Sequence, residues 1–251
     1  MVRIIMRGCN GHMGQVISEL VGQDSECEIV AGIDIYNNKS NSYPVFESLA
    51  DCHIAADVVI DFASVVGIDA FLAEAVERKL PIVLCTTGLS EEQVELVKQT
   101  SSYIPILKSA NMSLGVNILF KLVQEAAKVL GQAGFDIEIV EKHHNKKVDA
   151  PSGTALALAD AINEAMNNKY EYVFDRSHQR KAREKKELGI SAVRGGSIVG
   201  EHDVIFAGTD EVITFSHTAY SKAIFAQGAI SAAKFLPGKE PGIYTMKEVI
   251  G

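Results

Sequence analysis

The chain has 251 residues, of which 47% are hydrophobic and 22% are charged, and its formal net charge is -8. This length suffices for one large domain or for two smaller ones with proper cores. The negative charge argues against nucleic acid and anionic membranes as partners, because both need a positive protein surface. No apolar run approaches the roughly 20 residues that span a bilayer, and Met1–Met6 lack the layout of a signal peptide. We therefore expect a cytoplasmic protein that binds small anions through locally placed groups.

The cysteines are Cys9, Cys27, Cys52 and Cys85, and they are scattered along the chain. None forms a Cys-x-x-Cys pair or a cluster with histidine at metal-ligand spacing. The sequence therefore predicts neither a metal site nor a disulfide framework. Cys9 lies in a glycine-rich loop, where it is either a reactive thiol or simply a small side chain, and we favour the second.

A strand, a glycine-rich turn and a helix open the chain. The apolar run Val2–Met6 passes into Gly8, Gly11 and Gly14 and then into a helical pattern over 16–21. This is the context of a dinucleotide fingerprint, although the spacing is GxxGxxG and not GxGxxG. Gly8 permits the tight turn, Gly11 lets the backbone approach a pyrophosphate, and Gly14 allows close helix packing.

A second predicted strand, Glu28–Asp34, ends in an acid. An acid about 20 residues after the glycine loop accepts the ribose hydroxyls of an adenosine. The alternative is an ordinary aspartate in a turn. Ile35 stands where an arginine would meet a 2'-phosphate, which favours NADH, whereas Lys39 in the polar loop 37–42 leaves NADPH open.

Further strands alternate with helices up to residue 107. The predicted elements are strands Ala56–Phe62, Pro81–Cys85 and Ile104–Leu107, with a helix over 67–78 and another that begins after Ser90 as N-cap. Such alternation predicts a mostly parallel, doubly wound, Rossmann-like sheet, with ligands at the carboxyl ends of its strands.

After a long helix from Ser113 to Leu130, where we place a domain boundary, the pattern changes. Alternating apolar residues predict a second α+β domain built on an open mixed sheet. Its predicted elements are strands Phe135–Val140, Gly189–Arg194, Ser197–Val199, Asp203–Ala207 and Glu211–His217 and the helix Ala155–Met166, with a last helix over Lys222–Phe235. The charged run 167–188 is expected to be a solvated or mobile loop. His202 and His217 are expected to be structural.

The segment Glu141–Ala155 gathers the residues that carry chemistry. His143 and His144 leave a strand end on opposite faces, because strand side chains alternate. Lys147 follows in the connecting loop. Ser152 stands where an N-cap belongs, so the amides of Gly153 and Thr154 are expected to be free donors at a helix N-terminus, which attracts anions. Together they predict a pocket for a carboxylate-bearing substrate that must also receive a proton; the alternative is a surface turn with solvated lysines.

The run from His143 to Ala155 resembles the signature of the dihydrodipicolinate reductase family, and further matches run through most of the chain. The resemblance implies NAD(P)H-dependent reduction of 4-hydroxy-2,3,4,5-tetrahydrodipicolinate, a small dicarboxylate, to tetrahydrodipicolinate with loss of water. This oxidoreductase step belongs to the diaminopimelate route of lysine biosynthesis. The family implies a homotetramer.

The resemblance also implies roles for the residues of this segment. His143 is expected to be a proton donor or acceptor and Lys147 a second proton donor, chosen over Lys146 only by the family spacing HHxxK. His144, Gly153 and Thr154 are implied substrate contacts. Ser152 belongs to the same substrate-binding turn.

For the cofactor, the family pattern covers residues of four loops. No residue is assigned to a metal. The residues are Gly8, Cys9, Asn10, Gly11, His12, Met13, Asp34, Cys85, Thr86, Thr87, Ser109, Ala110, Asn111 and Met112. Two departures bear on the choice between NADH and NADPH: His12 stands where the family usually has arginine, and Cys85 where it usually has glycine.

The resemblance implies a division into a dinucleotide-binding domain (1–114), a substrate-binding and oligomerisation domain (115–219) and a C-terminal segment (220–251) that returns to the first domain. Two other hypotheses remain. One is another NAD(P)-dependent imine or amino-acid dehydrogenase, against which the His-His-x-x-Lys to Ser-Gly-Thr block argues. The other is a non-catalytic nucleotide-sensing protein, which should have lost His143 or Lys147.

Overall fold

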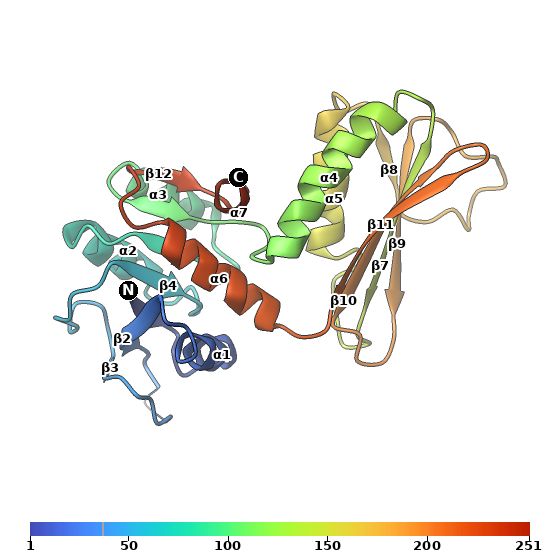
Figure 1. The fold of residues 1–251 in the computed structure, drawn as a ribbon. Helices are drawn as coiled ribbons and strands as arrows, with labels where there is room; N and C mark the ends of the chain where they lie inside the picture. The colour runs from blue at the N-terminus through green and yellow to red at the C-terminus, as the bar shows by residue number, and fades with distance from the viewer. Residues whose placement is uncertain (37) are drawn as a thin grey trace. The chain divides into compact units, whose positions relative to one another are not determined.

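A computed structural model describes residues 1–36 and 38–251 of the chain. The chain divides into two compact units (Figure 1), the first formed by Met1–Ser113 with Ala223–Gly251 and the second by Leu114–Lys222. Of the predicted polar loop 37–42, Asn37 lies outside the described residues, and residues 38–42 contain no helix or strand. None of the described helices combines the length and apolarity that crossing a bilayer takes.

The first unit is built on a seven-stranded sheet in the order β12-β6-β5-β4-β1-β2-β3, and every pairing in it is parallel. Its strands are β1 (Val2–Arg7), β2 (Cys27–Ile33), β3 (Val45–Phe46), β4 (Val58–Asp61), β5 (Ile82–Leu84), β6 (Pro105–Leu107) and β12 (Gly242–Tyr244). Its helices are α1 (His12–Val21), α2 (Ile68–Glu77), α3 (Glu91–Thr100), α6 (Ala223–Phe235) and α7 (Met246–Ile250). The predicted doubly wound parallel sheet is confirmed.

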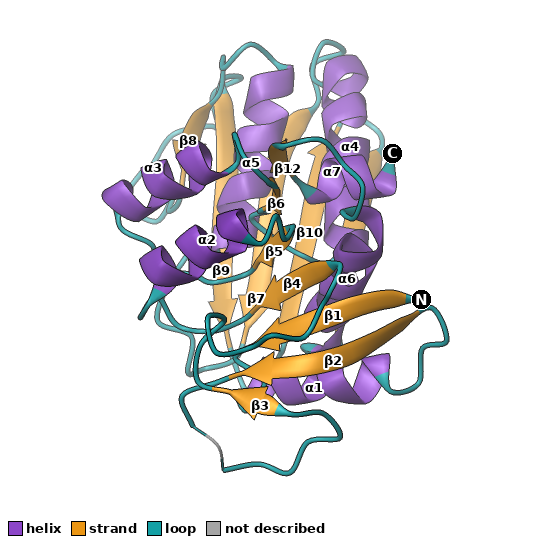
Figure 2. Cartoon of the chain, turned by 90° about the vertical axis from the view of Figure 1, so that its left-hand side faces the viewer, coloured by secondary structure: helices purple, strands orange, loops and turns teal. Residues whose placement is uncertain are grey.

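Helices cover both faces of this sheet (Figure 2), and the strands are therefore buried on both sides. Along β1 the side chains alternate: Ile4 and Met6 join the core that includes residues of α1 and α6, whereas Ile5 joins the core that includes residues of α2 and α3. Because the strands are parallel, their carboxyl ends lie along one edge of the sheet, where the connecting loops can bind a ligand.

The second unit is built on a five-stranded mixed sheet in the order β11-β10-β7-β9-β8. Its strands are β7 (Asp136–His143), β8 (Glu171–Val173), β9 (Glu187–Arg194), β10 (Gly200–Ala207) and β11 (Val212–Ala219), and its helices are α4 (Leu114–Leu130) and α5 (Gly153–Ala165). One core joins α4 and α5 to the inner side chains of β7, β9 and β10. The predicted second domain on an open mixed sheet is thus confirmed.

Two predictions about this unit are wrong. Ser197–Val199 is not a strand but part of the connection between β9 and β10, which pair with β7 on its two sides and not with each other. The charged run 167–188 is not only a solvated loop, because it contains β8. In addition, Arg183 bonds Asp136 and Glu138 at 2.9 Å each, which ties the run to β7.

Candidate active site

The glycine loop between β1 and α1 shows the close approaches that a nucleotide loop requires. Gly8 has a φ of 79°, in the left-handed region that favours glycine, and a Cβ atom there would lie 2.8 Å from the carbonyl oxygen of Phe62. A Cβ atom on Gly14 would lie 2.2 Å from the carbonyl oxygen of Gly8. The loop can therefore keep this shape only if position 14, in the first turn of α1, carries no side chain.

Asp34, directly after β2, organises this loop. Its carboxylate accepts the amide protons of Asn10 at 2.9 Å and of Tyr36 at 3.0 Å. The side-chain amide of Asn10 in turn donates to the carbonyl oxygen of Tyr36. Each carboxylate oxygen still has a lone pair for a further donor.

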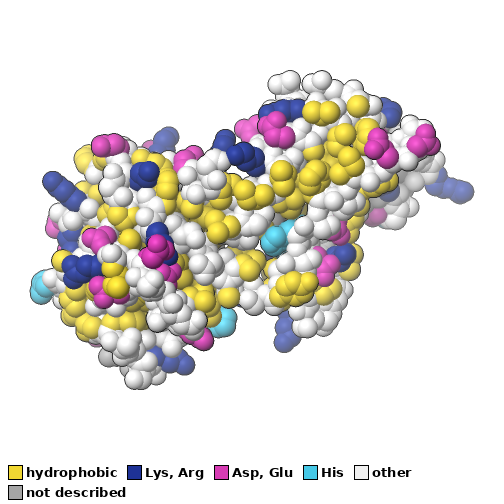
Figure 3. All heavy atoms as spheres, viewed as in Figure 1, with side chains coloured by type: hydrophobic (Ala, Val, Ile, Leu, Met, Phe, Trp, Pro, Cys, Tyr) yellow, Lys and Arg dark blue, Asp and Glu magenta, His cyan; other side chains and the backbone are white. Residues whose placement is uncertain are grey.

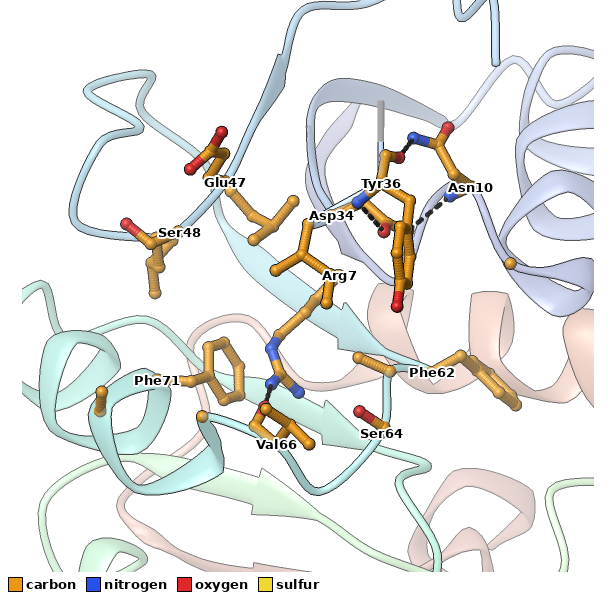
Figure 4. A pocket seen from close by; sticks show the side chains of 18 of the residues that line it. Arg7, Asn10, Asp34, Tyr36, Glu47, Ser48, Phe62, Ser64, Val66 and Phe71 are labelled. Atoms are coloured by element: carbon orange, nitrogen blue, oxygen red, sulfur yellow. Dashed lines mark hydrogen bonds between the residues drawn. The ribbon is translucent and has the colours of Figure 1, made fainter. Parts of the chain in front are cut away.

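A cavity of about 600 Å³ opens beside Asp34 and is lined by the first unit alone. Figure 4 shows Arg7 in its wall, beside Phe71 and Val66. The guanidinium of Arg7 donates to the buried carboxylate of Asp61 and to the carbonyl oxygen of Val66, each at 2.8 Å. Among the described residues that line the cavity, Arg7 is the one basic side chain, and Asp61 neutralises its charge.

The other predicted cofactor residues lie elsewhere. Cys85, Thr86 and Thr87 follow β5, and Ser109–Met112 follow β6, so they lie at the same sheet edge without lining this cavity. The hydroxyl of Thr86 points inward and donates to Asp61 at 2.7 Å. At the start of α1, His12 is exposed and Met13 is half-buried.

Burial controls the thiols of two predicted cofactor residues. It raises the pKa of Cys9 to about 11 and the pKa of Cys85 well above the usual value. Both groups therefore stay protonated at neutral pH, and a thiol is a poor nucleophile. Of the two interpretations of Cys9, the structure favours the small packing residue.

In the second unit, β7 carries the predicted site at its carboxyl end. Its buried side chains alternate, so that Ile137, Ile139, Glu141 and His143 share the inner face. The buried carboxylate of Glu141 therefore lies next to His143, the predicted proton donor, on the same face of β7.

The Glu141 carboxylate is fully buried and accepts hydrogen bonds from three directions. Oε2 lies 2.6 Å from Nδ1 of His143 and accepts from Nη1 of Arg194 at 2.7 Å. Oε1 accepts from Nη2 of Arg194 at 2.7 Å and from the amide of Ser152 at 2.9 Å. Burial would raise the pKa of Glu141, but the bonds from Arg194, His143 and Ser152 together lower it. The carboxylate is therefore ionised at neutral pH.

His202, on β10, completes this cluster. Its Nε2 lies 3.0 Å from the hydroxyl oxygen of Ser152, and its ring packs edge to face on His143 with 5.2 Å between centroids. Burial and the neighbouring His143 lower the pKa of His202 to about 4. His202 is therefore neutral at physiological pH and packs on His143 without adding charge.

Ser152 is the N-cap of α5, as predicted, and its hydroxyl accepts the amide proton of Ala155 at 3.2 Å. The side chain is buried and turned toward His202, whereas Gly153 is exposed and Thr154 is half-buried. The first amides of an α-helix have no acceptor within the helix, and Gly153 is the first residue of α5.

The remaining predicted residues lie on the loop between β7 and α5. Lys147 forms an ion pair with Asp149 at 2.8 Å, and this contact lowers the pKa of Asp149. Lys146 is exposed. Nδ1 of His144 is buried and finds no hydrogen-bond partner among the described residues.

Sequence reasoning missed two members of the cluster, Glu141 and Arg194, and did not place His202 beside His143. Glu141 left a signal, because it continues the alternation of Ile137 and Ile139 and therefore predicts a carboxylate on the buried face. No local pattern predicts the contact of Arg194 with Glu141, since that contact depends on the register that places Arg194 opposite His143 in the pairing of β7 with β9. His202 was assigned only a structural role.

Two models of one protein family match nearly the whole chain. Residues 2–112 match the family model described as "Dihydrodipicolinate reductase, N-terminus", and residues 115–250 match "Dihydrodipicolinate reductase, C-terminus".

Two curated relatives are similar from end to end. The 4-hydroxy-tetrahydrodipicolinate reductase of Caldanaerobacter subterraneus subsp. tengcongensis is 55% identical over 100% of this chain and 98% of its own length. The protein of the same name from Clostridium tetani is 49% identical over 98% of this chain and 96% of its own length.

Among solved structures, a dipicolinate-bound dihydrodipicolinate reductase from Paenisporosarcina sp. TG-14 has the same fold. Its TM-score is 0.82 at 23% identity, with 99% of each chain covered. A diaminopimelate dehydrogenase of C. glutamicum is less similar, with a TM-score of 0.57 at 14% identity over 100% of this chain and 95% of that one.

Proposed function

The chain belongs to the dihydrodipicolinate reductase family and is an oxidoreductase of lysine biosynthesis; we propose that the cluster around Glu141 is where it protonates and holds its substrate. The reaction is the reduction of 4-hydroxy-2,3,4,5-tetrahydrodipicolinate to tetrahydrodipicolinate with loss of water. The nicotinamide cofactor supplies the hydride. The first unit binds this cofactor, and the second binds the substrate.

His143 gives or accepts a proton, and Lys147 gives a second one. The observation that carries this proposal is the buried Glu141 carboxylate, which lies 2.6 Å from Nδ1 of His143 and leaves Nε2 for the substrate. An imidazole can both give and accept a proton and is therefore suited to proton transfer. Lys147, a positive charge beside this strand end, also stabilises the negative charge that hydride addition creates.

The N-terminal turn of α5 binds a substrate carboxylate. Gly153 and Thr154 supply main-chain donors and a hydroxyl, in line with the preference of helix N-termini for anions. Ser152 fixes this turn in two ways: its hydroxyl caps the helix, and its backbone amide donates a hydrogen bond to Glu141. His144 contacts the polar groups at the other end of the substrate.

The cofactor is a pyridine nucleotide, and we propose a preference for NADH. The cavity of the first unit holds the carboxylates of Asp34, Glu47 and Glu74, and its one described cation, Arg7, is paired with Asp61. A 2'-phosphate would meet negative charge there. Ile35 lines the cavity but carries no charge, and Lys39 is exposed and does not line the cavity.

The test is NADH oxidation on addition of the freshly made product of dihydrodipicolinate synthase, repeated with NADPH. We expect kcat/KM to favour NADH by at least ~10-fold, the effect of about 1.4 kcal/mol of charge repulsion. Asp34→Asn and Glu47→Gln, which each remove a carboxylate of the cavity, should both narrow this ratio, whereas Glu95→Gln, on α3 and outside the cavity, should leave it unchanged. Equal or better use of NADPH by the unaltered protein would contradict the preference.

We also propose that the chain forms a homotetramer through the second unit and acts in the cytoplasm, where NADH is available. A tetramer with two-fold axes needs two self-complementary patches. The second unit offers exposed apolar residues on its sheet, Val193 and Val212, and a stripe along α4 through Ile118 and Leu122 (Figure 3). Light scattering after gel filtration should give four times the chain mass of 27.1 kDa. A monomer mass would refute the tetramer without touching the reaction.

A further inference from the structure

We infer that Glu141 and Arg194 are positioning residues of this site: Glu141 fixes the His143 imidazole with its proton on Nδ1, so that Nε2 serves the substrate, and Arg194 holds Glu141 in place. The inference rests on the proposed role of His143. It concerns two residues that touch no predicted substrate group and that act through their neighbours.

The direction of the bond between Glu141 and His143 follows from the other partners of the carboxylate. Both oxygens of Glu141 already accept hydrogen bonds from Arg194 at 2.7 Å, and one of them also accepts a hydrogen bond from the Ser152 amide at 2.9 Å. An ionised carboxylate can only accept hydrogen bonds. Nδ1 of His143, 2.6 Å away, must therefore be the donor. In neutral imidazole the proton then sits on Nδ1, and Nε2 is left as the acceptor.

The space beside Nε2 is kept open by a glycine. A Cβ atom on Gly200, the first residue of β10, would lie 3.1 Å from Nε2 of His143. Any side chain there would press on the nitrogen that the Glu141 contact leaves unoccupied. The ring is thus held on its Nδ1 side by Glu141, and Gly200 brings no side chain to its Nε2 side.

Arg194 joins this pair to the loop that carries the second proposed proton donor. Its two terminal guanidinium nitrogens bind Glu141 in a bidentate geometry, and Nη2 also donates to the carbonyl oxygen of Asp149 at 2.7 Å. The Asp149 carboxylate holds Lys147 at 2.8 Å. Because Glu141 also accepts from the Ser152 amide, one carboxylate orients the imidazole, the lysine loop and the start of α5.

Glu141→Gln tests the inference, because glutamine keeps the size of the side chain but places an NH2 donor where one of the two oxygens now accepts a hydrogen bond from Arg194. We expect kcat to fall about 100-fold, as is typical when a group that orients a functional histidine is lost, with the KM for NADH unchanged. Arg194→Lys keeps the charge without the bidentate geometry and should give an intermediate kcat. A wild-type kcat in Arg194→Lys would overturn the role of Arg194.

The matched control is Glu138→Gln. Glu138 lies on the same strand but on the opposite face, where it binds Arg176 at 2.8 Å and Arg183 at 2.9 Å. This variant also breaks a carboxylate–arginine cluster, but it should keep the wild-type kcat. An equal loss in Glu138→Gln and Glu141→Gln would reduce Glu141 to a structural role. Unchanged turnover in His143→Gln would instead refute the proposed function of His143.

A second measurement does not depend on whether Glu141→Gln folds. Nitrogen-15 NMR of the histidine rings in the full-length protein, with His143 assigned by its absence in His143→Gln, reports which ring nitrogen carries the proton. The inference predicts a proton on Nδ1 and a bare Nε2 in the neutral ring. A proton on Nε2, with Nδ1 bare, would overturn it even if Glu141→Gln did not fold.

Discussion

The double substitution of His143 and Lys147 by alanine is expected to lower kcat by about 10⁴-fold while leaving the affinity for NADH unchanged. Proton transfer by one well-placed group contributes about 10²- to 10⁴-fold, and the two residues are the proposed donors. Both belong to the second unit, whereas Asp34 and the cavity beside it belong to the first. Steady-state kinetics with the synthase product, and NADH fluorescence titration, measure the two quantities separately.

Lys146→Ala is the matched control, since Lys146 is the exposed neighbour of Lys147 and carries the same charge. It should retain nearly full turnover. If Lys146→Ala lost activity and Lys147→Ala did not, the role of second donor would pass to Lys146. Wild-type turnover in the double variant would remove both His143 and Lys147 from the chemistry.

Gly14→Ala is expected to weaken NADH binding by at least ~100-fold and to destabilise the fold by about 2 kcal/mol, the typical cost of overpacking. The new Cβ would lie 2.2 Å from the carbonyl oxygen of Gly8 and 2.7 Å from Cα of Cys9, and both are backbone atoms. The helix or the glycine loop must therefore move. Alanine favours the helix by only about 1 kcal/mol, so the clash prevails.

The control for this variant is Gly22→Ala, at the other end of α1. Its added Cβ would lie 3.4 Å from the carbonyl oxygen of Ser18, a tolerable contact. Thermal unfolding and NADH titration should therefore give wild-type values. Unimpaired NADH binding by Gly14→Ala would mean that the close packing of α1 on the loop does not shape the nucleotide site.

The features that sequence reasoning predicted correctly are local ones. Ser90 and Ser152 cap their helices as predicted, because a cap needs only a side chain and an amide a few positions along. The parallel sheet of the first unit also follows from local patterns, since short apolar runs alternate with helical periodicity. Asp34 directly follows a strand, as the fingerprint required.

The features that were missed depend on contacts between distant segments. Arg194 reaches Glu141 across 53 positions, and Arg183 reaches Glu138 across 45. No pattern near either arginine reveals the register that brings it there. The same limit explains β8, a three-residue strand in the charged run that was expected to be a loop. Ser197–Val199 has the composition of a strand, but β9 and β10 on either side of it do not pair with each other.

The most direct test of the central claim is to follow a labelled hydride. NADH that carries deuterium at the transferable position of its nicotinamide is mixed with the protein and freshly made 4-hydroxy-tetrahydrodipicolinate, and the product is analysed by mass spectrometry. The account predicts tetrahydrodipicolinate with one deuterium, formed with loss of water, and no conversion by the His143 and Lys147 double variant within the time of the assay. Unchanged substrate, or a product without the label, would contradict it.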